Sequence, residues 1–233
     1  MSIAEKVAAM SGNNVVMTEN VPKVYEAGRK SEYDRFWDAY QENGNRTNYY
    51  FAFGGPGWTN STFNPKYSIF PSYIGYGMFW NSGISGDLEE ICEEKGIVLD
   101  FTGSKYMSYC FSQANSLKSV GIVDVSNAEK SLVQIFGNNI SIETIRLLKI
   151  REEQTLSGGF TNCISLQNIT IEGTIGNNFD IHFSPLTHES LMSIINHLGT
   201  VTTTKTLTLG STNLAKLTDA EKAIATEKGW TLA

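Results

Sequence analysis

The stretch Leu117-Lys-Ser-Val-Gly-Ile122 recurs twice in this chain, as Ile142-Glu-Thr-Ile-Arg-Leu147 and as Leu166-Gln-Asn-Ile-Thr-Ile171. Each copy has apolar residues at its first, fourth and sixth positions, and the copies follow one another after 25 and then 24 residues. A phenylalanine stands six residues before each copy: Phe111, Phe136 and Phe160. Three copies in phase, each with the same upstream aromatic residue, indicate a repeated structural unit.

The apolar spacing within each copy predicts a strand. Val120 and Ile122 are separated by one residue, so we expect both to point inward while the residue between them points outward. One turn of chain cannot bury its own apolar stripe, so successive turns must stack and pair in parallel at about 4.8 Å. A period of about 20 to 29 residues with this core is typical of a leucine-rich repeat. The sequence therefore predicts an α/β fold, a short leucine-rich-repeat solenoid with a parallel ribbon of strands and helical caps at both ends.

The apolar strand pattern continues on both sides of the three copies, which indicates one domain over residues 1–233. Ile97-x-Leu99 and Leu207-x-Leu209 are predicted to add strands to the same ribbon. A helix that begins after Thr187 and ends before Gly199 accounts for the longer gap before Leu207. We divide the domain into a helical N-terminal cap, an aromatic and glycine-rich region, the repeats and a helical C-terminal cap, at residues 1–45, 46–85, 86–214 and 215–233.

Two aromatic-rich segments before the repeats each allow two interpretations. Within residues 1–45, aromatic residues that include Trp37 recur at helical spacing. This aromatic stripe either covers the end of the stack of turns or binds a partner. In the segment Asn48–Trp58, the rings of Tyr49, Tyr50 and Trp58 either form a platform on which sugars stack or pack against each other in a compact loop region. At the other end, Thr218-Asp-Ala-Glu221 predicts a capping box, with Gly229 ending the helix.

Composition excludes some classes of function. The net charge of −6 argues against non-specific binding of nucleic acid, which needs a positive surface. No stretch approaches about 18 consecutive apolar residues, so we expect no membrane insertion. The first ten residues lack the basic and apolar segments of a secretory signal peptide. The sequence leaves open whether the protein stays inside the cell, leaves it by another route or is carried by a particle.

Motifs for catalysis, metals and cofactors are missing from the sequence. The three cysteines have no paired spacing, and Cys163 occupies the position of Ala114 and Asn139 in the other copies, which predicts a buried thiol. The histidines match no compact zinc pattern. A short helix over Asp87–Glu94 presents four glutamates, which is typical of a solvated face. We expect no cofactor, no metal and no enzymatic activity.

Two resemblances suggest what the repeats do. The segments Met107–Ile122 and Phe160–Ile171 resemble the BspA-like leucine-rich repeats of bacterial surface proteins, although only about half of the chain repeats and Met107 is displaced from the usual position. Segments outside the repeats, among them Glu19–Gly28, Phe36–Arg46 and Ala223–Trp230, are similar to proteins of gut Firmicutes, often prophage-associated. The first resemblance implies adhesion and protein–protein binding at the cell surface, and the second implies a phage-linked accessory or tail protein.

Three hypotheses for function follow. The first is a non-catalytic binding or adhesion module for a protein or host-surface ligand, with Arg146, Thr170 and Thr208 as outward-facing candidates between core residues of their strands. The second is a structural or receptor-binding component of a phage particle, which predicts a stable oligomer. The third is a carbohydrate-binding module that uses Tyr49, Tyr50 and Trp58.

Overall fold

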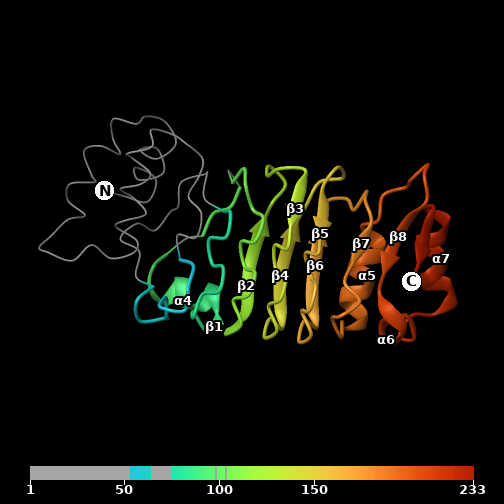
Figure 1. The fold of residues 1–233 in the computed structure, drawn as a ribbon. Helices are drawn as coiled ribbons and strands as arrows, with labels where there is room; N and C mark the ends of the chain where they lie inside the picture. The colour runs from blue at the N-terminus through green and yellow to red at the C-terminus, as the bar shows by residue number, and fades with distance from the viewer. Residues whose placement is uncertain (1–52, 64–74, 98, 103) are drawn as a thin grey trace, which may run out of the picture.

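The computed structural model of the protein describes residues 53–63, 75–97, 99–102 and 104–233. Over these residues the fold is α/β, with parallel sheets and short helices. Figure 1 shows successive turns of the chain stacked along one direction, with the strands of neighbouring turns side by side. The predicted helical region 1–45 lies outside the described residues, and so do Tyr49 and Tyr50.

The largest sheet contains the three sequence copies. Its strands, in spatial order, are β1 (Gly86–Asp87), β2 (Leu117–Asp124), β4 (Thr144–Lys149) and β6 (Asn168–Glu172). All neighbours are parallel, with Val120 opposite Ile145 and Ile145 opposite Ile169. The prediction that these three segments pair side by side in one parallel sheet is confirmed.

A row of stacked phenylalanine rings runs through the core beside this sheet. The predicted three rings, Phe111, Phe136 and Phe160, follow one another with centroids 5.2 and 5.7 Å apart and interplanar angles of 5° and 17°. The row continues through Phe79 and Phe53 in one direction and Phe179 in the other. All six rings are at most 1% exposed. One buried aromatic per turn therefore forms a continuous spine of six residues.

Residues with a left-handed backbone conformation flank the phenylalanines of the spine, two positions before or after them in the sequence. Phe111 lies between Tyr109 and Gln113, whose φ angles are 61° and 60°, and all six non-glycine residues with positive φ in the described ranges flank a ring of the spine in this way. Such a conformation costs roughly 1–2 kcal/mol for a residue with a Cβ. The N–H groups of Tyr109 and Gln113 donate to carbonyls of the following turn, at 2.8 and 3.0 Å. These inter-turn hydrogen bonds offset the strain and hold adjacent turns together.

The predicted inward orientation of Ile122 is wrong. Ile122 is 43% exposed, and the next residue, Val123, is buried in its place. In β4 the buried residue is Leu148, while Leu147 is only half-buried. The register between β4 and β6 shifts between Ile145 and Leu148, because β2 and β4 carry one more residue between inward positions than β6 does. In β6 the predicted pattern is found, with Ile169 and Ile171 both buried.

The remaining strands form two smaller parallel sheets. One pairs β3 (Ser131–Val133) with β5 (Thr155–Ser157), and the other has β8 (Lys205–Thr208) between β7 (Phe179–Asp180) and β9 (Trp230–Leu232). The Leu207 segment therefore belongs to a separate sheet, contrary to prediction. Ile97 and Leu99 lie in no strand, and β1 takes the predicted place beside β2.

Four helices accompany the strands in the described part of the chain: α4 (Leu88–Glu94), α5 (His188–Asn196), α6 (Gly210–Leu214) and α7 (Asp219–Glu227). The helix predicted after Thr187 is found as α5, and the side chains of Asp87 and Thr187 accept hydrogen bonds from backbone N–H groups in the first turns of α4 and α5. Helix α5 covers the edge of β6, where the hydroxyls of Ser190 and Ser193 accept from the backbone N–H groups of Ile169 and Ile171, each at 2.9 Å. The sheet therefore ends at β6, because these backbone N–H groups of the edge strand already have hydrogen-bond partners on α5.

The predicted capping box of α7 is present and makes the stability of this helix depend on pH. Thr218 donates from its backbone and side chain to Glu221 at 2.8 and 2.9 Å, and His188 lies 2.8 Å from the same carboxylate. These hydrogen bonds from Thr218, and then the contact with His188, lower the pKa of Glu221 below its ordinary value of 4.5. The stabilisation is therefore present above pH 4.5 and is lost as the pH falls through the lowered pKa.

We expect Glu221→Gln to lower the thermal midpoint at pH 7, and the difference from the unchanged protein to vanish as the pH falls well below 4.5. The measurement is thermal unfolding by circular dichroism from pH 7 to pH 2.5. Glu227→Gln, at the other end of α7, is the control and should show no comparable pH-dependent difference. A Glu221→Gln difference that is constant across this range would contradict the assignment.

Candidate binding face

The outward positions of β2, β4 and β6 form one continuous face, which we call the outer face. It alternates with the buried positions of the same strands and is made of fully or partly exposed residues: Lys118, Ser119, Gly121, Ile122, Asp124, Thr144, Arg146, Leu147, Lys149, Asn168, Thr170 and Glu172. Because the strands are tied together by parallel hydrogen bonding, these side chains are presented on a rigid surface.

The extra residue in β2 and β4 places apolar side chains on this face. Ile122 and Leu147 are paired in the register of the two strands. Ile122 is 43% exposed, and Leu147 is half-buried. An apolar pair on the outward side of a sheet is a feature that a binding partner can cover, since burying it removes apolar area from water. Sequence reasoning missed this pair because it assigned both residues to the core.

Ion pairs between different turns of the chain border the apolar pair. Lys118 contacts Glu143 at 2.8 Å, Lys149 contacts Glu172 at 3.0 Å, and Arg146 forms an ion pair with Glu89 of α4. Such exposed pairs contribute about 0–1 kcal/mol each to stability. Their larger effect is on recognition, because they fix a pattern of alternating charge around Ile122 and Leu147.

The sequence candidates separate into four groups. Arg146 and Thr170 are both exposed on adjacent strands of the outer face. Thr208 is half-buried on β8, in a different sheet, so the structure does not bring it to this face. Trp58 is 5% exposed and packs edge-on against Phe53 with centroids 5.1 Å apart, which leaves no free ring face for a sugar. Tyr49 and Tyr50 lie outside the described residues.

Beside the outer face, a cavity of about 310 Å³ opens between α4 and β2. Its walls are mainly apolar, and they include Phe111 of the spine and Ile122 of the outer face. Glu89 and Glu93 of α4 also line it. The glutamates were predicted as a solvated face of a helix. Glu90, Glu93 and Glu94 are exposed as predicted, whereas the half-buried Glu89 has its carboxylate over Gly121, where an added Cβ would lie only 2.7 Å from it, and in contact with Arg146.

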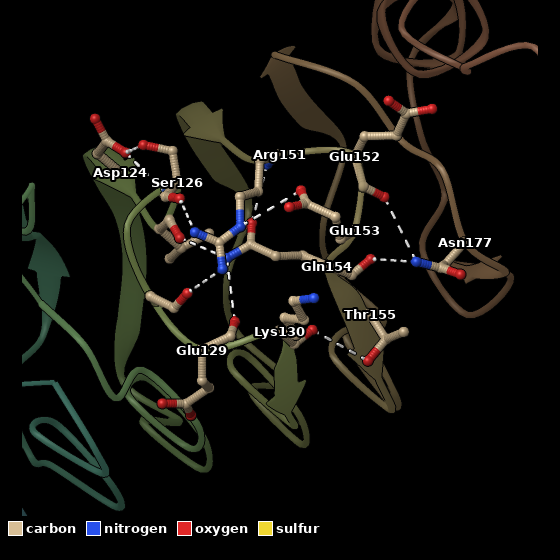
Figure 2. A network of polar contacts seen from close by, with 12 residues as sticks. Asp124, Ser126, Glu129, Lys130, Arg151, Glu152, Glu153, Gln154, Thr155 and Asn177 are labelled. Atoms are coloured by element: carbon tan, nitrogen blue, oxygen red, sulfur yellow. Dashed lines mark hydrogen bonds and ion pairs between the residues drawn. The ribbon is translucent and has the colours of Figure 1, made fainter.

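A polar network at the carboxyl ends of the strands is structural (Figure 2). The guanidinium of Arg151 donates to the carbonyls of Ser126 and Ala128 at 2.9 and 2.8 Å, and Glu153 lies 3.5 Å from its Nε. Gln154, which is buried, donates to the carbonyls of Val125 and Glu129. These donors satisfy the backbone of the preceding loop, so the network holds neighbouring turns together and leaves little capacity for a ligand.

Similar hydrogen bonds occur in the turns on either side of this one. Asn127 donates to the carbonyl of Thr102 in the turn before it, and Asn177 donates to the carbonyls of Glu152 and Gln154 in the turn before it. Figure 2 shows Asn177 reaching across to the Glu152 and Gln154 loop. One long polar side chain in each of these loops thus binds the backbone of its neighbour.

Cys163 is buried as predicted, and Cys92 and Cys110 are buried free thiols as well. Burial raises the pKa of Cys92 and of Cys163 to about 12, and it also raises the pKa of Cys110. All three are therefore neutral thiols at neutral pH and poor nucleophiles. Cys163 donates to the carbonyl of Phe136 at 3.2 Å, as the amide of Asn139 does to Phe111 at 3.3 Å.

No group of three or more potential metal ligands occurs in the described ranges. Comparison of the chain with protein-family models, curated proteins and solved structures gave no significant match. Among the helices that the structure describes, none has the length and apolar character needed to cross a membrane.

Proposed function

We propose that this chain is a short leucine-rich-repeat solenoid that acts as a non-catalytic binding module for a protein or host-surface ligand. The repeat interpretation is supported by the sequence period, the parallel register of β2, β4 and β6, and the row of phenylalanine rings. Helices α5 and α7 then serve as the C-terminal cap. Repeat architectures of this kind are most often binding scaffolds.

The observation that carries the binding role is the apolar pair on the outer face, in which Ile122 is exposed and Leu147 is half-buried. Ile122 and Leu147 project from a hydrogen-bonded sheet and are bordered by charged side chains. Protein interfaces commonly have this composition, with an apolar centre inside a polar rim. In the proposed role, Arg146 and Thr170 belong to the rim, and the function is adhesion or protein–protein interaction at a cell surface.

The proposal predicts that charge on the outer face abolishes binding. We expect Ile122→Lys and Thr170→Lys each to weaken binding of the labelled full-length protein to cultured intestinal epithelial cells at least tenfold, because the first places a lysine in the apolar centre of the contact and the second places a long charged side chain where the rim must fit the partner. The measurement is cell-associated fluorescence against protein concentration. The thermal midpoint of each variant verifies folding.

Ile164→Lys is the matched control, because Ile164 is 53% exposed but lies in the loop before β6, outside the outer-face strands. It should leave binding unchanged. Equal loss in all three variants would point to a non-specific effect of charge. Absence of saturable binding by the unchanged protein, or full binding by both outer-face variants, would contradict the proposal.

A further inference from the structure

The cavity between α4 and β2 exists because the turn that carries Phe79 contains a helix where the following turns contain a strand. β1 pairs with β2 only through Gly86 opposite Leu117 and Asp87 opposite Ser119. After Asp87 the chain continues directly as α4, so the residues of β2 from Val120 onward have a helix beside them instead of a parallel strand. Helix and strand do not fill the same space, and a cavity of about 310 Å³ remains.

The lining of the cavity combines an apolar interior with an acidic wall. The apolar surface comes from Leu88, Ile97, Leu99, Phe101, Phe111, Val120, Ile122 and Val123. Glu89 and Glu93 lie one helical turn apart on the same side of α4, and both line the cavity. Glu90 and Glu94 lie elsewhere on the helix and do not line the cavity.

The two carboxylates of this wall differ in how they are compensated. Glu89 is paired with Arg146. Glu93 is exposed, and no ion pair to it is found within the part of the chain that the structure describes. One uncompensated negative charge therefore stands beside an apolar cavity. A complementary ligand places an apolar group inside and a positive charge at Glu93.

We propose that the cavity accepts one leucine or phenylalanine side chain of a partner protein, next to a lysine or arginine whose charge meets Glu93. This proposal rests on the proposed protein-binding function and locates an anchor point for it. The cavity is continuous with the outer face, because Ile122 belongs to both. A partner lying across Ile122 thus passes the mouth of the cavity, where a single buried anchor contributes most to affinity.

The test uses three capped peptides as probes: Gly-Lys-Phe-Lys-Gly, Gly-Glu-Phe-Glu-Gly and Gly-Lys-Ser-Lys-Gly. Each is titrated into the full-length, isotope-labelled protein at low salt, and amide chemical shifts are followed by NMR. We expect saturable shifts at Leu88, Glu93, Gly121 and Ile122 with the first peptide, and at least fivefold weaker binding of the other two. Raising the salt to about 0.5 M should weaken the first peptide further, since the exposed charge is screened.

Three variants separate charge from shape. Glu93→Gln should weaken the Lys-Phe-Lys peptide at least fivefold, whereas Glu90→Gln, an equal change of charge on the same helix, should not. Leu99→Phe, which fills the cavity without changing charge, should also weaken it at least fivefold. The proposal is overturned if the three peptides bind equally, if none shifts the cavity amides at millimolar concentration, or if Glu93→Gln and Glu90→Gln behave alike.

The result is distinguishable from failure of the proposed function. Thr170→Lys leaves the cavity untouched, so it should bind the Lys-Phe-Lys peptide normally even where it abolishes cell binding. Saturable cell binding without any peptide response refutes the anchor cavity alone. A cavity that binds the peptide in a protein without saturable cell binding supports the cavity and refutes the adhesion role.

Discussion

Replacing Phe136 with alanine is expected to lower the free energy of unfolding by about 3–5 kcal/mol, the usual range for deleting a fully buried phenylalanine. Phe136 is 0% exposed and lies in the middle of the spine, stacked on Phe111 at 5.2 Å and on Phe160 at 5.7 Å. Its loss removes two ring contacts and leaves a cavity between rigid turns. The backbone on both sides is fixed by inter-turn hydrogen bonds and cannot collapse to fill it.

The measurement is chemical unfolding with urea, together with the thermal midpoint, which should fall by roughly 6–20 °C for a chain of this length. Phe183→Ala is the control, because Phe183 is 43% exposed and lies outside the spine. It should change stability by less than about 1 kcal/mol. Similar losses for the two variants would show that the spine has no special role in holding the turns together.

The part of the fold that can be predicted from the sequence is the part in which the same short apolar pattern recurs from turn to turn. Three apolar hexads with a phenylalanine at a fixed distance were enough to place β2, β4 and β6 beside each other, and the stacked rings confirm the phase. The spine also includes Phe53, Phe79 and Phe179, which were not predicted. Ser85 stands six residues after Phe79, and α4 follows it in place of an apolar strand, so the hexad that marks the other turns is missing.

The inward pattern of β2 was mispredicted for a different reason. Ile122 is followed by Val123, and Leu147 by Leu148, so each strand offers two adjacent apolar residues and alternation alone does not choose between them. In β6, Glu172 follows Ile171 and removes this ambiguity, so the prediction there is correct. In the structure, β2 and β4 both have two residues between their inward positions, so the second apolar residue of each pair, Val123 or Leu148, is the buried one.

The candidate site depends even more on contacts between distant residues. Arg146 and Thr170 were predicted as outward-facing because they lie between core positions of their strands. The partner of Arg146 is Glu89, 57 residues earlier in the sequence, and nothing local connects them. The cavity likewise results from replacing a strand by a helix in one turn. Burial of Trp58 is decided by Phe53 and the start of the spine, which its own aromatic-rich segment does not reveal.

Gly173→Ala is expected to destabilise the protein by several kcal/mol, of which about 1–2 kcal/mol reflects the left-handed backbone alone. Gly173 follows β6 and has a φ of +99°. A Cβ at this position would lie 1.9 Å from the carbonyl oxygen of Ile150, which is backbone of the preceding turn and cannot rotate away. The alanine therefore forces two turns apart where the backbone of Ile150 donates to the carbonyl of Glu172 at 2.9 Å.

Gly55→Ala separates the two contributions. Gly55 has nearly the same φ, +98°, but no atom of the described residues lies within 4 Å of its added Cβ. Its alanine variant should therefore show only the conformational cost of roughly 1–2 kcal/mol, and urea unfolding of both variants measures the difference. A clearly larger loss for Gly173→Ala means that backbone contact between turns sets how closely they stack after β6. Equal losses would mean that the turns can separate freely there, and the close approach at Gly173 would then have no role in stability.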